Sequence, residues 1–223
     1  MFIVAANWKM NGDRKFATEF VQELKTLNSS HEVIIFPPAT LLGFVDFKKG
    51  AQDCCYREYG PFTGQISAEM VKDTGAEYTL LGHSERREHY QETSEMICSK
   101  AKSAHKSGLK TIICVGEKDG EDFETVVSDQ IKKSLPFTSN SVNTVIAYEP
   151  VWAIGTGKTP TIAEIEQRQK FIKDKTKLPV IYGGSVKPDN ATEIANAANV
   201  DGLLVGGASL VAKDFIKIIE AKK

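Results

Sequence analysis

Short runs of β-branched and other apolar residues recur along the whole chain, and they constrain the fold more than any other feature. Most of the runs are continuous rather than alternating in polarity, which is typical of parallel strands that are covered on both faces. They occupy residues 2–6, 33–36, 51–55, 78–82, 110–115, 144–148, 179–183 and 202–206. We therefore predict eight buried strands in a parallel sheet.

Amphipathic segments with helical spacing lie between these runs. One apolar stripe consists of Phe16, Phe20, Val21, Leu24 and Leu27. A second, partly apolar stripe consists of Ile162, Ile165, Gln169 and Ile172. The second helix is expected to start after Pro160 and the pattern T-x-x-E at 161–164, because this pattern caps the free N–H groups of a first helical turn.

Eight strands that alternate with helices predict either a closed (β/α)8 barrel or an open, doubly wound sheet. Even spacing without a break in composition favours the barrel, as a single α/β domain over residues 1–223. Only about ten residues, 40–49, connect the second run to the third, near the minimum for a crossover with its helix. The chain has 223 residues, whereas such barrels typically have roughly 250. We therefore expect some shortened outer helices and no missing strand.

Charge and composition exclude several classes of function. The formal net charge is −1 and no basic stripe indicates a nucleic-acid partner. No apolar run is long enough to cross a membrane, and the N-terminus lacks the pattern of a signal peptide. The cysteines show no C-x-x-C spacing and two are adjacent, which favours reduced thiols in a cytoplasmic protein; they are Cys54, Cys55, Cys98 and Cys114.

Polar residues follow the first and fourth runs, at the strand ends where barrels and open parallel sheets carry their chemistry. Asn7 and Lys9 follow the first run, and Lys9 offers a positive charge to an anionic substrate unless it is simply solvated. His83 follows the fourth run, directly before a helix that begins at Ser84. A helix N-terminus disfavours imidazolium, so we expect a neutral His83 that donates a hydrogen bond. A histidine that only caps the helix or packs is the alternative.

Glu149 stands at the tip of the sixth run, in the segment A-Y-E-P-V-W-A-I-G-T-G-K-T-P-T at 147–161. Pro150 cannot extend a strand ladder, so the strand ends there. A carboxylate at a strand end, followed by a loop with small residues, predicts a base with a lid. A buried loop anchored by a tryptophan is the alternative, but it leaves the glycines unexplained. The predicted lid consists of Val151, Trp152, Ala153, Ile154, Gly155, Thr156, Gly157 and Lys158.

Paired glycines follow the last two runs, as Y-G-G-S at 182–185 and G-G-A-S at 206–209. Paired glycines let a backbone approach a ligand closely, and their amides, with a helix N-terminus, bind phosphate. One such pair is usually a turn. Two pairs at successive strand ends indicate a phosphate site, where barrels frequently have one.

The letters G-T-G-K-T at 155–159 also look like part of a nucleotide-binding loop. Such a loop requires G-x-x-x-x-G-K-[ST], but the position five before Gly157 is Trp152. Its helix starts at the lysine, whereas Pro160 and the capping pattern place the start later. No acidic strand end is an evident metal partner. The sequence therefore argues against a nucleotide site.

Five segments together resemble the triosephosphate isomerase family, across essentially the whole chain. The segments are A-N-W-K-M-N (6–11), G-H-S-E-R-R (82–87), A-Y-E-P-V-W-A-I-G-T-G-K (147–158), Y-G-G-S-V (182–186) and L-V-G-G-A-S-L (204–210). The resemblance implies a TIM-barrel isomerase of glycolysis and gluconeogenesis that interconverts dihydroxyacetone phosphate and D-glyceraldehyde 3-phosphate. It implies neither a cofactor nor a metal.

The resemblance also implies roles for individual residues. Glu149 is the base that moves a carbon-bound proton, and neutral His83 polarises the carbonyl and moves protons between the two oxygens. Lys9 offsets the negative charge of the substrate while Asn7 orients it. Glu85 anchors Lys9 through an ion pair. Backbone amides that hold the phosphate are expected near Gly155, Ser185, Gly206 and Gly207.

The segment Y-R-E-Y-G-P-F-T-G-Q at 56–65 has aromatic residues in a loop rich in glycine and proline. It reads as a surface loop, but the resemblance implies that it enters a second subunit and that Thr63 reaches the site there. We therefore expect a homodimer. Many family members have a glutamate where this chain has Gln65, and that acid pairs with a partner arginine, here Arg86. The amide of Gln65 can still hydrogen-bond but carries no charge, so we expect the interface to be adjusted there.

Three alternatives compete with an isomerase. A nucleoside triphosphatase is weakened by the failed nucleotide-loop pattern. A non-catalytic sugar-phosphate-binding barrel is the second alternative, because a fold does not fix a function. The joint presence of Asn7, Lys9, His83 and Glu149 argues against it. An aldolase-type lyase requires a Schiff-base lysine inside a strand, and none of the runs has one in its interior.

Overall fold

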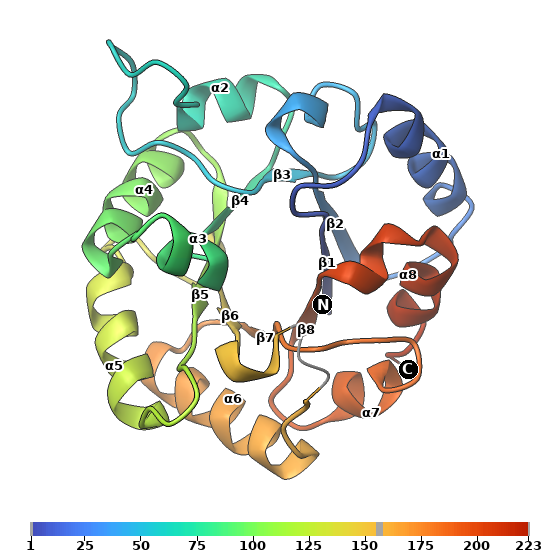
Figure 1. Ribbon diagram of the computed structural model, residues 1–223, viewed down its shortest axis with the longest axis vertical. Coiled ribbons are helices and arrows are strands. Elements are labelled where there is room, and N and C mark those ends of the chain that lie inside the picture. Colours follow the sequence, from blue (N-terminus) through green and yellow to red (C-terminus); the bar gives the residue numbers. More distant parts are fainter. Residues whose placement is uncertain (1, 155–157, 223) are drawn as a thin grey trace.

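The computed structural model describes residues 2–154 and 158–222. Its eight strands are parallel and form an inner ring, and the helices surround them (Figure 1). The hydrogen-bonded order is β2-β1-β8-β7-β6-β5-β4-β3. The strands are β1 Ile3–Asn7, β2 Glu32–Phe36, β3 Gly50–Ala51, β4 Tyr78–Leu81, β5 Lys110–Val115, β6 Thr144–Tyr148, β7 Val180–Tyr182 and β8 Gly202–Val205. The predicted (β/α)8 barrel is confirmed.

β2 and β3 are the two ends of this order, and the seam between them is closed by few backbone contacts. Ile35 N donates to Lys48 O at 3.0 Å, and Ile35 forms an isolated parallel bridge with Lys49. The run predicted at 51–55 is wrong in length, because β3 ends at Ala51. Beyond that residue, the side chains of Gln52 and Asp53 bond to neighbouring segments and replace the ladder.

Helices of very different length make the outer ring. They are α1 Arg14–Leu24, α2 Ala68–Asp73, α3 Ser84–His89, α4 Ser94–Lys106, α5 Phe123–Ser134, α6 Ile162–Thr176, α7 Ala191–Asn196 and α8 Ala212–Ile219. Three 3₁₀ turns accompany them, namely η1 Ala39–Leu41, η2 Val151–Ala153 and η3 Gly207–Leu210. The expected shortening is confirmed: only η1 lies between β2 and β3, and α2, α3 and α7 have 6 residues each.

The predicted helix signals match the structure closely. The capping box at the start of α6 is present, with Thr161 Oγ1 accepting from Glu164 N and Thr161 N donating to Glu164 Oε2. In α1 the buried part of the predicted stripe is Phe20, Val21 and Leu24, whereas Leu27 lies beyond the end of the helix. Among the residues that the structure describes, no helix is long and apolar enough to cross a membrane.

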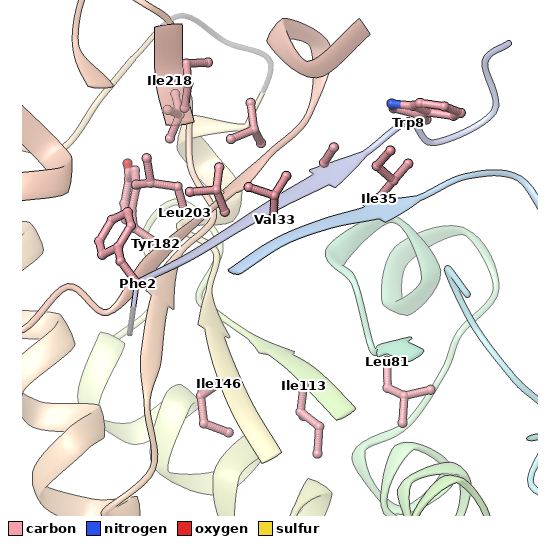
Figure 2. Close-up of a cluster of buried hydrophobic side chains, with 14 of the residues drawn as sticks. Phe2, Trp8, Val33, Ile35, Leu81, Ile113, Ile146, Tyr182, Leu203 and Ile218 are labelled. Carbon is pink, nitrogen blue, oxygen red and sulfur yellow. The ribbon is translucent and has the colours of Figure 1, made fainter. Parts of the chain in front are cut away.

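Side chains of the strands alternate between two apolar clusters. Inside the barrel lie residues from seven strands: Ile3, Ala5, Ile34, Phe36, Tyr78, Leu80, Ile112, Cys114, Val145, Ala147, Ile181 and Leu204. Their neighbours along each strand pack outward against the helices. Figure 2 shows part of this outer cluster, including Val33, Ile35, Ile113, Ile146 and Leu203. Both faces of the strands are therefore buried, as the continuous apolar runs indicate. The four cysteines are free thiols.

His105, near the end of α4, joins the beginnings of β5 and β6 at the amino end of the barrel. Its Nε2 lies 3.1 Å from Thr111 Oγ1 and 3.3 Å from Thr144 Oγ1, and its Nδ1 lies 2.8 Å from Thr138 Oγ1. Burial lowers the pKa of His105 below its ordinary value, against a smaller opposing effect of a hydrogen bond with Asn143. The folded protein therefore favours a neutral imidazole here.

We expect the His105→Gln variant to lose less stability than the wild type when the solution becomes mildly acidic. As the pH falls through the ordinary histidine pKa of about 6.5, the unfolded chain binds a proton that folded His105 resists. The free energy of unfolding therefore falls as the pH falls. Urea unfolding at pH 7.5 and 5.0 measures this slope, with His89→Gln, an exposed histidine, as control. A slope identical in wild type and His105→Gln would contradict the argument.

Candidate active site

A pocket of about 220 Å³ opens at the carboxyl ends of the strands. Most of the predicted site residues line it, and they come from the ends of β1, β4, β6, β7 and β8. They are Asn7, Lys9, His83, Glu149, Ser185, Gly206 and Gly207, joined by Ile154 of the predicted lid. The structure thus brings together residues separated by up to two hundred positions, because parallel strands end on one rim.

Glu149 directly follows β6, and its side chain is only 2% exposed. Its backbone N donates to Val115 O at 2.8 Å, which continues the pairing of β6 with β5. Its Oε2 accepts a hydrogen bond of 3.0 Å from Ser84 N, in the first turn of α3. Its Oε1 lies 3.3 Å from His83 Nε2 and accepts no hydrogen bond from any described residue. One carboxylate oxygen is therefore held, and the other is available as a base.

Two glycines make room for Glu149, Gly116 beside its backbone and Gly183 beside its side chain. A Cβ on Gly116 would lie 1.7 Å from Glu149 O, and a Cβ on Gly183 would lie 2.9 Å from Glu149 Cγ. Any side chain at Gly116 would displace the backbone of Glu149. The sequence reasoning missed Gly116, although its position just after the fifth run was the available signal.

His83 is the N-cap of α3, and it lines the pocket. Its Nδ1 accepts a hydrogen bond of 3.3 Å from Glu85 N. A ring nitrogen that accepts from an amide carries no proton, so the proton lies on Nε2. Nε2 is 3.3 Å from Glu149 Oε1, but the two do not meet the geometry of a hydrogen bond. Glu85 Oε2 is 3.6 Å from Nδ1, too far for a hydrogen bond. His83 can therefore cap the helix through Nδ1 and still donate a hydrogen bond through Nε2.

Lys9 also lines the pocket and is fixed at several atoms. Its Nζ forms an ion pair of 2.5 Å with Glu85 Oε1, as the resemblance implies. Its N donates to Asn7 Oδ1 at 3.0 Å, and its backbone has a positive φ of 52°. Burial raises the pKa of Glu85, but the hydrogen bond from Lys9 and neighbouring positive charges outweigh burial and lower it. The pair is therefore an ionised carboxylate with an ammonium.

The paired glycines shape the other end of the pocket. A Cβ on Gly184 would lie 2.1 Å from Tyr182 Oη, and a Cβ on Gly206 would lie 3.5 Å from Lys9 Cε. Gly207 begins η3, and Ser209 N donates back to Gly206 O at 2.8 Å. Gly206 and Gly207 line the pocket, so this curled segment presents backbone there without side chains. Gly155, the remaining predicted phosphate contact, lies outside the described residues, as do Thr156 and Gly157.

The described part of the predicted lid is tied to a buried carboxylate. Val151–Ala153 form η2, and Trp152 Nε1 donates to Glu117 Oε1 at 2.9 Å. Glu117 is 2% exposed and also accepts from Tyr148 Oη at 3.1 Å and from Arg168 at 2.6 Å. The sequence reasoning missed this carboxylate. An acidic residue two positions after the fifth run was the signal that could have identified it.

The predicted dimer loop extends away from the barrel between β3 and α2 (Figure 1). Thr63 and Gln65 are exposed in it, and neither lines the pocket of its own chain. Arg86 is the residue expected to pair with Gln65 of a second subunit. In this structure it forms ion pairs within its own chain. Its guanidinium lies 2.9 Å from Asp53 Oδ2 and 2.6 Å from Glu92 Oε1.

These features define a (β/α)8-barrel enzyme whose pocket is lined by a buried carboxylate beside a histidine, by a lysine and by paired glycines. The chain matches the family model for triosephosphate isomerase over residues 2–222. It is 42% identical to the triosephosphate isomerase of Xanthomonas campestris pv. campestris (strain 8004), over 98% of this chain and 97% of that protein. It is 44% identical to that of Rhodopseudomonas palustris (strain BisA53), over 97% and 95%.

Among solved structures, the fold is similar to that of triosephosphate isomerase from Bartonella henselae. The TM-score is 0.91, the identity is 38%, and the match covers 99% of this chain and 98% of that one. The chain belongs to the triosephosphate isomerase family.

We expect Gly116→Ala to lower kcat/KM by about hundredfold, the cost of a displacement of about 1 Å in a catalytic group. The added methyl group would meet Glu149 O at 1.7 Å and force the segment to move. Steady-state kinetics with a triose phosphate measures the effect. Gly43→Ala is the matched control, because a Cβ at Gly43 meets no atom of the described residues within 4 Å. Equal activity in the two variants would refute the packing argument.

Proposed function

We propose that this protein interconverts dihydroxyacetone phosphate and D-glyceraldehyde 3-phosphate through an enediolate, with Glu149 as the base. The observation that carries the proposal is the position of the Glu149 carboxylate beside His83, at the carboxyl ends of the strands. Glu149 Oε1 accepts no hydrogen bond from the described residues and lies 3.3 Å from His83 Nε2. Membership of the triosephosphate isomerase family supports the same reaction.

The chemistry follows from the two oxygens of Glu149. Oε2 is held by Ser84 N, so Oε1 takes the proton from the carbon next to the substrate carbonyl. The C–H electron pair becomes the carbon–carbon double bond, and the carbonyl electron pair moves onto oxygen. Glu149 then returns the proton to the neighbouring carbon. Because ketose and aldose are isomers, atoms and electrons balance without a further reactant.

His83 and Lys9 stabilise the charge that develops on the oxygens. His83 Nε2–H is assigned to the carbonyl oxygen, where a hydrogen bond strengthens as negative charge grows. It also transfers protons between the two oxygens. Lys9 is assigned to offset the charge of the phosphate and the enediolate, and Asn7 to orient the substrate. Glu85 positions Lys9 through the ion pair of 2.5 Å.

The phosphate is assigned to the glycine-lined end of the pocket. Backbone amides near Ser185, Gly206 and Gly207 are the proposed donors, with Gly155 contributed by the lid. The lid at 151–158 is proposed to exclude water, because an exposed enediolate phosphate would eliminate phosphate. The hydrogen bond between Trp152 and Glu117 supports this, since it gives the lid a fixed anchor at its N-terminal end.

We also propose that the residues 1–223 act as one domain and that two copies form a cytoplasmic homodimer. The projecting loop at 56–65 supports the dimer, because it exposes apolar surface that a monomer would leave in water. Tyr59 is 85% exposed, and Tyr56 and Phe62 are 42% and 40% exposed. In this proposal Thr63 reaches the partner's site and Gln65 lies at the interface near Arg86. Free thiols are typical of a reducing compartment.

The test of the reaction is incubation with dihydroxyacetone phosphate in heavy water. We expect deuterium uptake and the aldose product, and a loss of both by about 10²–10⁴-fold in Glu149→Gln, the range for a general base. Glu193→Gln, an exposed glutamate on α7, is the control. Exchange that survives Glu149→Gln would remove the role given to Glu149. Binding without turnover in the wild type would favour a non-catalytic sugar-phosphate-binding barrel.

Sedimentation measures the proposed assembly. We expect a dimer at micromolar concentration, and a shift toward monomer in Tyr59→Asp, because a charge buried without a partner is unfavourable at an interface. Phe137→Asp is the matched control, since Phe137 is fully exposed in the connection that precedes β6, at the amino end of the barrel. A monomeric wild type would contradict the dimer.

A further inference from the structure

Lys9 has a backbone conformation that is unfavourable for a residue with a side chain. Its φ is 52°, in the left-handed region, and it is one of four non-glycine residues with positive φ in the described chain. Strained residues persist only where their surroundings fix them, and they cluster at functional sites. The strain at Lys9 therefore points to neighbours that hold its two peptide groups.

The peptide group before Lys9 is fixed by a local contact. Lys9 N donates to Asn7 Oδ1 at 3.0 Å. The preceding carbonyl, that of Trp8, accepts from Asn11 Nδ2 at 2.8 Å. These bonds link residues close in sequence, so they do not connect Lys9 to the rest of the barrel.

The peptide group after Lys9 is fixed by a distant residue, Gln52. Gln52 Nε2 donates to Lys9 O at 2.9 Å and to Phe36 O at 2.8 Å. Gln52 directly follows β3, Phe36 ends β2 and Lys9 lies two residues beyond β1. One amide nitrogen thus joins the ends of three strands. Among the described residues, no other hydrogen bond to Lys9 O is present.

The chemistry of this contact requires a neutral donor with two hydrogens on one nitrogen. Glutamate has the same shape, but it would place an oxygen against two carbonyl oxygens. Methionine has a similar length and donates nothing. Phe36 O would keep a second donor, Trp8 N at 3.1 Å, so the loss would fall mainly on Lys9.

We propose that Gln52 is a positioning residue for catalysis: it holds Lys9 in the left-handed conformation that directs the ammonium group into the pocket. Gln52 does not touch the reacting atoms in this proposal and acts only through Lys9. The inference rests on the role proposed for Lys9 in the isomerase reaction.

The first experiment compares Gln52→Met and Gln52→Glu with the wild type in steady-state kinetics. Both variants should lower kcat/KM by roughly ten- to hundredfold, because a catalytic group moves by a fraction of an ångström to about 1 Å. The matched control is Asn196→Leu. Asn196 Nδ2 also donates to two backbone carbonyls, those of Thr192 and Ala221, at 2.8 and 3.1 Å on the outer ring. The Asn196→Leu variant should lose stability and keep the kcat/KM of the wild type. Wild-type activity in Gln52→Glu, folded by circular dichroism, would overturn the proposal.

The second experiment repeats Gln52→Met in a Lys9→Ala background. If Gln52 acts only through Lys9, the two losses are not additive, and Gln52→Met has almost no further effect on kcat/KM there. A merely structural role would lower kcat/KM by the same factor in both backgrounds, which would overturn the proposal. Wild-type activity in Lys9→Ala would remove the role of Lys9 itself, and with it this inference. The role of Glu149 would still be decided by its own isotope test.

Discussion

The closure of the barrel between β2 and β3 is the constraint on which the rest of the structure depends. All eight strands run parallel, so closing the ring places their carboxyl ends on one rim. The seam is thin, because β3 has two residues and Ile35 makes the bridging contacts. The Gln52 side chain supplements it, because it donates to Phe36 O at the end of β2 and to Lys9 O, two residues beyond β1. The weakest part of the sheet is therefore also the part that supports Lys9.

Buried carboxylates follow from the same arrangement. Glu149, Glu117 and Glu92 are nearly inaccessible to solvent, and burying such charges is unfavourable unless they are paired or hydrogen-bonded. Glu117 accepts from a tyrosine, a tryptophan and an arginine, and Glu92 meets Arg86 and Lys100. Glu149 has one bound oxygen and one without a donor among the described residues. Glu117 is hydrogen-bonded at both oxygens, whereas Glu92 and Glu149 each keep one oxygen without a donor among the described residues. Glu92 lies against two cations, while the ion-pair partner of Glu149 is a histidine.

Much of the fold was predictable from local patterns. Continuous apolar runs identified the strands, and the T-x-x-E pattern identified the start of α6 at the observed residue. The length of the third strand was not predictable, because apolar Cys54 and Cys55 look like strand residues while Gln52 and Asp53 bond elsewhere. Gly116, Glu117 and Gln52 were missed as site residues for a related reason. Each contacts a segment far away in sequence, so the local sequence shows at most a position near a strand end and not the contact itself.

The sequence by itself determined the alternation of strands and helices, and it placed Asn7, Lys9, His83 and Glu149 at strand ends. These features depend on side-chain periodicity and on glycine and proline chemistry, which act over a few residues. Only the tertiary structure decided that Ser84 N binds Glu149 Oε2, that Trp152 bonds to Glu117 and that Gln52 bonds to Lys9. These contacts depend on strand order and register around a closed ring, where groups distant in the chain meet at hydrogen-bond distance.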